Sequence, residues 1–228
     1  MKKQIFYLVY LLGIVLPTLP SLAFTITDGT AHVQVLSGPQ AFTNGGPLQS
    51  DTDIFFFKER ADYVLPSNLT VDVTQPGTYV TNNLPSSTSE ISSGTQIDSY
   101  LIHMDVLNTK TFTNAATILF SNTILGLILI DPQLTDSDWV GDPNSLYSPA
   151  PKARWVMEPH DQITLENDRR TLVIDSLRVG SQQPYADQIR IITSPETIVP
   201  EPAVAGLVVF AGFSFIGINR FLRRRTGK

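Results

Sequence analysis

Residues 97–107 read IDSYLIHMDVL, in which apolar and polar side chains alternate along an extended segment. Successive side chains of a β-strand point to opposite faces of its sheet. One face of this segment carries Tyr100, Ile102, Met104 and Val106. The opposite face carries His103 and Asp105. The pattern predicts a strand with one side in a core and the other in water, and hence a β-sheet domain.

Short segments on both sides of this strand extend the same pattern. Ile124 to Ile130, interrupted only by Gly126, is apolar without alternation, which predicts a strand covered on both faces. No segment of the domain has a sustained 3.6-residue apolar period. The other segments that predict strands are 24–27, 31–36, 54–58, 69–73, 117–120, 154–157, 162–165, 170–179 and 188–193. We expect an all-β fold, a two-sheet antiparallel sandwich of roughly eight to ten strands with jelly-roll-like connections.

The connections between the expected strands differ in composition. Residues 38–53 and 82–95 are rich in Gly, Pro, Ser, Thr and Asn, which predicts loops. Residues 131–151 form the longest interruption of the strand pattern, and 135–141 within it predict a helical turn with an Asp or Ser cap.

This longest interruption also holds the best candidate metal site. Its acidic side chains are Asp131, Asp136, Asp138 and Asp142. Carboxylates at such short spacing on a turn can surround a hard cation, which makes calcium the one candidate cofactor. The segment lacks the closing glutamate of an EF-hand loop. The alternative is that these residues solvate the surface and cap turns, and both interpretations stay open.

Aromatic residues in or beside the loops suggest a second kind of site. They are Trp139, Tyr147, Trp155 and Tyr185. Aromatic rings stack on the apolar face of a sugar, so these positions are candidates for a carbohydrate-binding surface. The alternative is that the rings close the ends of the sandwich.

Composition and charge exclude several classes of function. Seven of the 16 lysines and arginines, but one of the 21 acidic residues, lie outside residues 24–199, so this part has a net charge of about −11 against −5 for the whole chain. Such a negative domain is not expected to bind nucleic acid. The chain has no cysteine, which excludes thiol chemistry and thiolate zinc sites. Its three histidines show no ligand spacing.

The sequence also lacks the motifs of the common hydrolases. There is no Gly-x-Ser-x-Gly elbow and no His-Glu-x-x-His pair. Glu158-Pro159-His160-Asp161 holds acid and base side chains but is typical of a turn. A glycosidase needs two carboxyl groups facing each other across a cleft, which sequence alone does not reveal. We expect a protein that is not an enzyme, with a secreted hydrolase as the weakest alternative.

The N-terminus has the layout of a secretory signal peptide, residues 1–23. Lys2 and Lys3 precede the apolar stretch from Ile5 to Leu16, and Pro17 to Pro20 interrupts it. The small residues Ser21 and Ala23 then suit cleavage before Phe24. The apolar stretch is too short to span a bilayer comfortably, so we expect export and removal of a signal helix.

The C-terminus has the layout of a membrane anchor. Residues 203–218 are 16 residues without a charge, about 24 Å as a helix, which is somewhat less than the ~30 Å hydrocarbon core. Phe221 and Leu222 lengthen the segment, giving an expected transmembrane helix at 203–222 and a basic tail at 223–228. The positive residues that fix the cytoplasmic side are Arg220, Arg223, Arg224 and Arg225.

Just before this helix, the linker 195–202 ends in Val199, Pro200, Glu201 and Pro202. The proline-glutamate-proline triplet, the apolar helix and the arginine block together resemble the PEP-CTERM sorting signal of exported bacterial proteins. The resemblance implies a Gram-negative-type envelope, a temporary stay in the inner membrane, and processing near the triplet by an exosortase, a membrane-embedded cysteine protease or transpeptidase. It further implies delivery to the cell surface or extracellular matrix, often alongside exopolysaccharide production.

Within the expected β-sandwich domain, residues 24–194, the part from about 97 to 193 is similar to a recurrent type of β-domain carried by such signals. The segments that carry the similarity are 97–103, 124–126, 137–138 and 187–193. The similarity implies no activity. We therefore expect an exported surface or matrix protein with a structural, biofilm-associated role, and a carbohydrate-binding module for extracellular polysaccharide is the alternative.

Overall fold

The computed structural model describes residues 23–80, 83–108, 110–148, 154, 159–179 and 186–195. Across these residues strands dominate and the helices are two short turns, so the all-β prediction is confirmed. The expected signal helix, linker, transmembrane helix and basic tail lie outside the described residues, apart from Ala23 and the first linker residue, Pro195. In the described part of the chain, no helix has the length and apolar character needed to cross a membrane.

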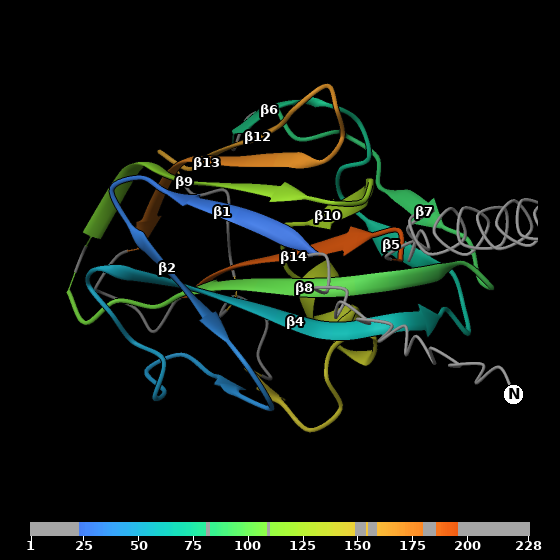
Figure 1. The fold of residues 1–228 in the computed structure, drawn as a ribbon, viewed down its shortest axis with the longest axis horizontal. Helices are drawn as coiled ribbons and strands as arrows, with labels where there is room; N and C mark the ends of the chain where they lie inside the picture. Colours follow the sequence, from blue (N-terminus) through green and yellow to red (C-terminus); the bar gives the residue numbers. More distant parts are fainter. Residues whose placement is uncertain are drawn as a thin grey trace, which may run out of the picture.

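Two five-stranded sheets form the body of the molecule (Figure 1). Sheet A has the order β1 (Phe24–Asp28), β9 (Lys110–Phe120), β13 (Thr171–Val179), β12 (Gln162–Leu165) and β6 (Gly77–Val80). Sheet B has the order β10 (Ile124–Ile128), β14 (Asp187–Thr193), β8 (Gln96–Met104), β4 (Asp53–Val64) and β2 (His32–Leu36). Apolar side chains from the facing sides of both sheets make the largest core cluster.

Aromatic rings fill one end of this core. The Phe56 ring stacks on Tyr100 with centroids 5.6 Å apart, and Tyr100 meets Phe120 edge-on at 5.1 Å. Phe24, the first residue of β1, places its ring edge-on to Phe56 at 4.7 Å. The strand that begins at the expected signal cleavage point is therefore anchored in the core from its first side chain.

The strands are not all antiparallel, so that part of the prediction is wrong at two places. β2 pairs in parallel with β4, and β3 (Ala41–Phe42) pairs in parallel with β11 (Leu146–Tyr147). A parallel pair needs a long crossover, and the segment 37–52 between β2 and β4 provides one. This segment was expected to be a loop throughout, but it contains β3.

The second expected loop also holds a strand. β7 (Ser89–Ile91) lies within 82–95 and pairs with β5 (Leu69–Val71). Together with β3 and β11, these short strands form two small sheets outside the sandwich. Each of these four strands is two or three residues long and pairs with a strand that is not its neighbour in the sequence. Local composition therefore did not reveal them.

A third layer covers the outer face of sheet B, which corrects the expectation that β8 has one face in water. His103 and Asp105 are 0% and 3% exposed. Part of the cover comes from the segment between β10 and β11, which contains α1 (Gln133–Asp136) and the 3₁₀ turn η1 (Asp138–Val140). Leu134 and Val140 of this segment join a cluster with Leu69, Val71 and Ile91 of the β5–β7 pair and with outer-face residues of sheet B.

The other cover is smaller and lies over the middle of β8. Phe42 of β3 packs against Phe57 and Leu101 of sheet B, with the half-buried Tyr147 of β11 beside them. The helical turn expected at 135–141 is confirmed by α1 and η1, but neither has the expected side-chain cap hydrogen bond. The strand expected from Ile124, covered on both faces, is confirmed as β10.

Gly126 in β10 lies at a register shift and faces Val71 of β5 at close range. A Cβ atom added to Gly126 would lie 2.9 Å from both Cγ atoms of Val71, which is fully buried. We expect Gly126→Ala to lower the free energy of unfolding of residues 24–195 by about 1–3 kcal/mol through overpacking.

The same substitution in a Val71→Ala background tests the cause in a double-mutant cycle of guanidinium unfolding. Because the smaller side chain leaves room for the new methyl group, the two energies should couple by about 1 kcal/mol or more. Strict additivity of the two single substitutions would contradict this account.

Both ends of the described domain meet one tight turn between β9 and β10. The carbonyl oxygen of Ala23 accepts hydrogen bonds from the Ser121 N–H at 2.9 Å and the Ser121 hydroxyl at 3.1 Å. On the other side of the turn, the Ser194 N–H donates to the Thr123 carbonyl at 2.9 Å. The chain therefore enters and leaves the sandwich at the same corner.

Candidate functional site

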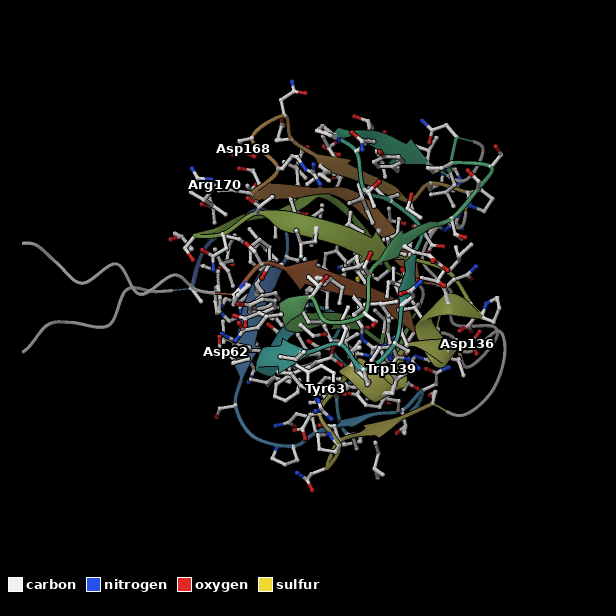
Figure 2. All side chains as sticks on the ribbon, turned by 90° about the vertical axis from the view of Figure 1, so that its right-hand side faces the viewer. Asp62, Tyr63, Asp136, Trp139, Asp168 and Arg170 are labelled. Carbon is white, nitrogen blue, oxygen red and sulfur yellow. The ribbon has the colours of Figure 1, made fainter. Side chains whose placement is uncertain are left out.

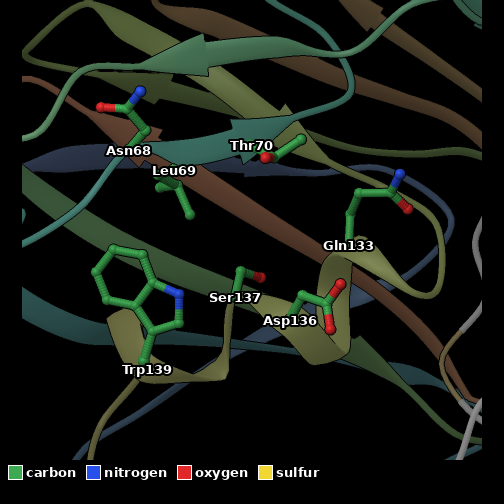
Figure 3. Close-up of a pocket in the computed structure, with 7 residues that line it drawn as sticks. All are labelled: Asn68, Leu69, Thr70, Gln133, Asp136, Ser137 and Trp139. Carbon is green, nitrogen blue, oxygen red and sulfur yellow. The ribbon is translucent and has the colours of Figure 1, made fainter.

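A small groove lies on the third layer, between the β5 strand and the α1–η1 segment. Its volume is about 160 Å³. Its lining residues are Asn68, Leu69, Thr70, Gln133, Asp136, Ser137 and Trp139. Figure 3 shows the Trp139 indole on one side, with its ring nitrogen turned toward the middle, and Asp136 and Gln133 on the other side.

An aromatic and cationic stack supports the Trp139 side of the groove. The Tyr63 ring lies 6.4 Å from the Trp139 ring, and the Arg60 guanidinium lies over Tyr63 at 4.2 Å from the ring centroid. The Arg60 Nε–H donates to the Gly141 carbonyl at 2.6 Å, which fixes the guanidinium in place. Figure 2 shows Tyr63 and Trp139 side by side, with Asp136 on the same face of the molecule.

A buried ion pair fixes the floor beneath the groove. The Arg190 side chain on β14 donates to both carboxylate oxygens of Glu59, at 2.9 and 3.0 Å, and both side chains are fully enclosed. Arg190 also donates to the Ser137 hydroxyl at 2.6 Å, and thereby holds the segment that links α1 to η1. The groove is therefore connected directly to the buried charges of sheet B.

The charges shift each other's pKa values in opposite directions. Burial alone would lower the pKa of Arg190, but Glu59 and Asp138 raise it above its ordinary value. Burial alone would raise the pKa of Glu59, but Arg190 lowers it below its ordinary value. Both groups stay ionised at neutral pH, as a buried pair must when it is well hydrogen-bonded.

A second buried arginine extends the network away from the groove. The Arg154 Nη1 donates to both oxygens of Asp138, at 2.8 and 2.7 Å, and its Nε donates to the Gln188 side-chain oxygen at 2.6 Å. The Gln188 amide then donates to the Phe42 carbonyl at 3.2 Å and to the His103 Nδ1 at 2.9 Å. This chain of contacts joins the third layer to the centre of sheet B.

The predicted calcium residues share one segment but face different partners. Asp138 pairs with Arg154 and Arg190, whereas a cation site needs free carboxylate oxygens. Asp131 accepts from the Thr135 hydroxyl at 3.0 Å, and Asp142 accepts from the Asn144 N–H at 2.9 Å. Asp136 is exposed in the groove. No three His, Asp or Glu side chains group as metal ligands within the described ranges.

The predicted aromatic residues are separated in the same way. Trp139 lines the groove, whereas Tyr147 is half-buried and donates its hydroxyl to Glu59 at 2.7 Å. Burial and the Glu59 charge raise the pKa of Tyr147 well above its ordinary value, which keeps its hydroxyl protonated as a donor. Trp155 and Tyr185 lie outside the described residues, as do the sorting triplet and the arginine block.

Sequence reasoning missed the other half of the groove. Thr70 and Asn68 come from the β5 region and Gln133 from α1, and single polar residues at these positions carry no recognisable signal. They come together because Leu69 and Leu134 pack in the same apolar cluster. Comparisons of this chain with family models, curated proteins and solved structures gave no match.

Proposed function

We propose that this is an exported cell-surface or extracellular-matrix protein that an exosortase recognises and processes through its C-terminal segment. The observation that carries the proposal is the sequence from Val199 to Pro202, followed by the uncharged segment 203–218 and the arginine block. The arginines place the tail on the cytoplasmic side of the inner membrane and the β-domain outside it. Its role at the surface is structural, in a biofilm or exopolysaccharide matrix.

The geometry of the domain ends supports this proposal. Phe24 begins β1 and Thr193 ends β14, so cleavage before Phe24 and near the triplet would leave both sheets complete. Signal cleavage would remove only the Ala23 carbonyl from the hydrogen bonds of the β9–β10 turn. Because both ends leave at one corner, the domain suits a precursor that is attached to a membrane on one side.

The delivered module is a jelly-roll-like sandwich in this proposal. The chain alternates between the sheets over much of its length, from β8 in sheet B to β9 in sheet A and on to β10 in sheet B. Repeated crossing between two sheets is the feature that jelly rolls share. Of the residues that line the groove, Asp136 alone is acidic, which favours a binding role over the paired carboxylates of a glycosidase.

The triplet is tested by replacing Glu201 with alanine in the native host. We expect export to continue and the unprocessed precursor to accumulate in the inner membrane, because the charged centre of the recognition element is lost. Immunoblotting of membrane and surface fractions, with mass spectrometry of the product, measures this outcome.

Glu196→Ala is the matched control, since it removes an acidic residue from the same linker but outside the triplet. It should be processed normally. A Glu201→Ala protein of normal mature size at the cell surface would contradict the sorting proposal.

A further inference from the structure

We propose that the groove between β5 and α1–η1 binds one unit of a neutral saccharide, with Trp139 as its stacking platform. The cavity of about 160 Å³ has room for about five water molecules, which matches one sugar ring and not a larger ligand. This inference gives the delivered domain a ligand class, and it does not depend on how the domain is delivered.

The platform is fixed before any ligand arrives. Trp139 is partly exposed and packs against the apolar cluster beneath the third layer, while Tyr63 and Arg60 support it from the side. A rigid, partly exposed indole offers an apolar face to the C–H face of a sugar at little cost in side-chain ordering.

Polar groups around the platform have hydrogen-bonding capacity that the described fold does not use. Within the described ranges, no protein group bonds the Trp139 ring N–H or the Asp136 carboxylate. The indole N–H and the carboxylate are therefore available to a ligand in the groove.

This mixture of free donors and acceptors fits a polyhydroxylated ring. A sugar hydroxyl both donates and accepts, so adjacent hydroxyls can donate to the Asp136 carboxylate and accept from the Trp139 N–H. The Asp136 charge and the net charge of about −11 on residues 24–199 oppose an anionic ligand. The ligand that fits is therefore uncharged.

Two other residues that line the groove, Ser137 and Asn68, are also held in place. The Ser137 hydroxyl donates to the Leu134 carbonyl at 3.0 Å and accepts from Arg190 at 2.6 Å. Asn68 is also held, because its amide nitrogen donates to Glu90 at 2.8 Å and its oxygen accepts from the Ser93 N–H at 3.0 Å. These bonds set the width of the groove, which favours recognition of one ring size.

The test uses the full-length chain in a detergent without a sugar headgroup and measures saturation-transfer NMR. The probes are glucose, mannose, galactose and N-acetylglucosamine, with glucuronate as the charged counterpart. We expect saturable binding of at least one neutral sugar, with a dissociation constant on the order of 1 mM for so small a ligand, and no binding of glucuronate.

Three variants locate the binding in this groove. Asp136→Asn and Trp139→Phe should each weaken binding about tenfold, because the first weakens one hydrogen bond without a change of shape and the second removes the ring N–H and part of the stacking surface. Trp139→Ala should abolish it. Glu166→Gln changes an exposed acidic residue next to the β12–β13 turn, away from the groove, and should bind like the unmodified chain.

Circular dichroism of each variant confirms that it is folded, and Asp136→Asn changes an exposed side chain that the fold does not need. Absence of binding for all four neutral probes, equal affinity of Asp136→Asn and Glu166→Gln, or glucuronate binding as tight as that of a neutral sugar would each overturn the proposal. None of these results would alter the outcome of the Glu201→Ala experiment, so the two proposals fail separately.

Discussion

Replacing Arg190 with methionine is expected to lower the free energy of unfolding of residues 24–195 by about 3–5 kcal/mol. The substitution leaves the Glu59 carboxylate fully buried without its cationic partner and removes a donor to Ser137. An unpaired buried charge is among the most destabilising features that a single substitution can create. Guanidinium unfolding followed by tryptophan fluorescence measures the effect.

Two further variants separate the loss of the ion pair from the loss of packing. Arg178→Met changes an exposed arginine on β13 and should alter the free energy of unfolding by less than about 0.5 kcal/mol. Glu59→Met combined with Arg190→Met removes both charges, so it should recover a large part of the stability lost by Arg190→Met alone. An Arg190→Met protein that unfolds at the same midpoint as the unmodified chain would contradict a stabilising role for this pair.

The strands of the sandwich were the most predictable part of the fold, because alternation and apolar runs record the burial of whole faces. The segment 162–165 was predicted with the bounds that β12 has. The third layer was not predictable in the same way. The polar residues His103 on β8 and Asp105 just after it indicated a face in water, yet they are buried beneath the third layer. Alternation distinguishes polar from apolar faces, but it does not distinguish solvent from a buried polar network.

The candidate site was predictable only where the type of a single residue indicated a binding role. Trp139 stood out in a loop, and the structure places it in the groove. Asp138 looked like its acidic neighbours in the sequence, but its partners Arg154 and Arg190 come from distant segments. Likewise Thr70 and Gln133 face one groove only because two separate segments pack together. The sorting segment at 199–225 stays a prediction from sequence.

Because His103 on β8 is buried, we expect the free energy of unfolding to fall with decreasing pH already above the range in which carboxylates titrate. Burial, reinforced by the nearby Arg154 charge, lowers the pKa of His103 from 6.5 to about 3. The hydrogen bonds show why the neutral form is required. The Gln188 oxygen accepts from Arg154, so the Gln188 NH₂ group must face the His103 Nδ1, which can accept its hydrogen bond only when unprotonated.

The sign of the effect follows from linkage. The unfolded chain binds a proton at His103 below about pH 6.5 and the folded chain does not, so the stabilising contribution is complete above pH 6.5 and is lost as the pH falls toward 3. The loss from this group should reach about 2 kcal/mol at pH 5, where most carboxylates of the unfolded chain are still ionised. Guanidinium unfolding of residues 24–195 at several pH values from 7.5 to 5 measures the slope of the free energy of unfolding against pH.

His103→Gln isolates this contribution, because glutamine can still bond Gln188 but does not titrate. Asp72 and Asp105, whose pKa values burial raises, favour the fold as the pH falls, so the slope of the unmodified chain combines opposing contributions. The difference in slope between the unmodified chain and His103→Gln is therefore the decisive quantity, and it should correspond to about one proton per molecule near pH 5.5.

His160→Asn changes an exposed histidine and serves as the matched control, and we expect it to have the slope of the unmodified chain. If His103→Gln showed that same slope, His103 would have to titrate alike in the folded and unfolded chains, and the buried contact with Gln188 would not hold it neutral.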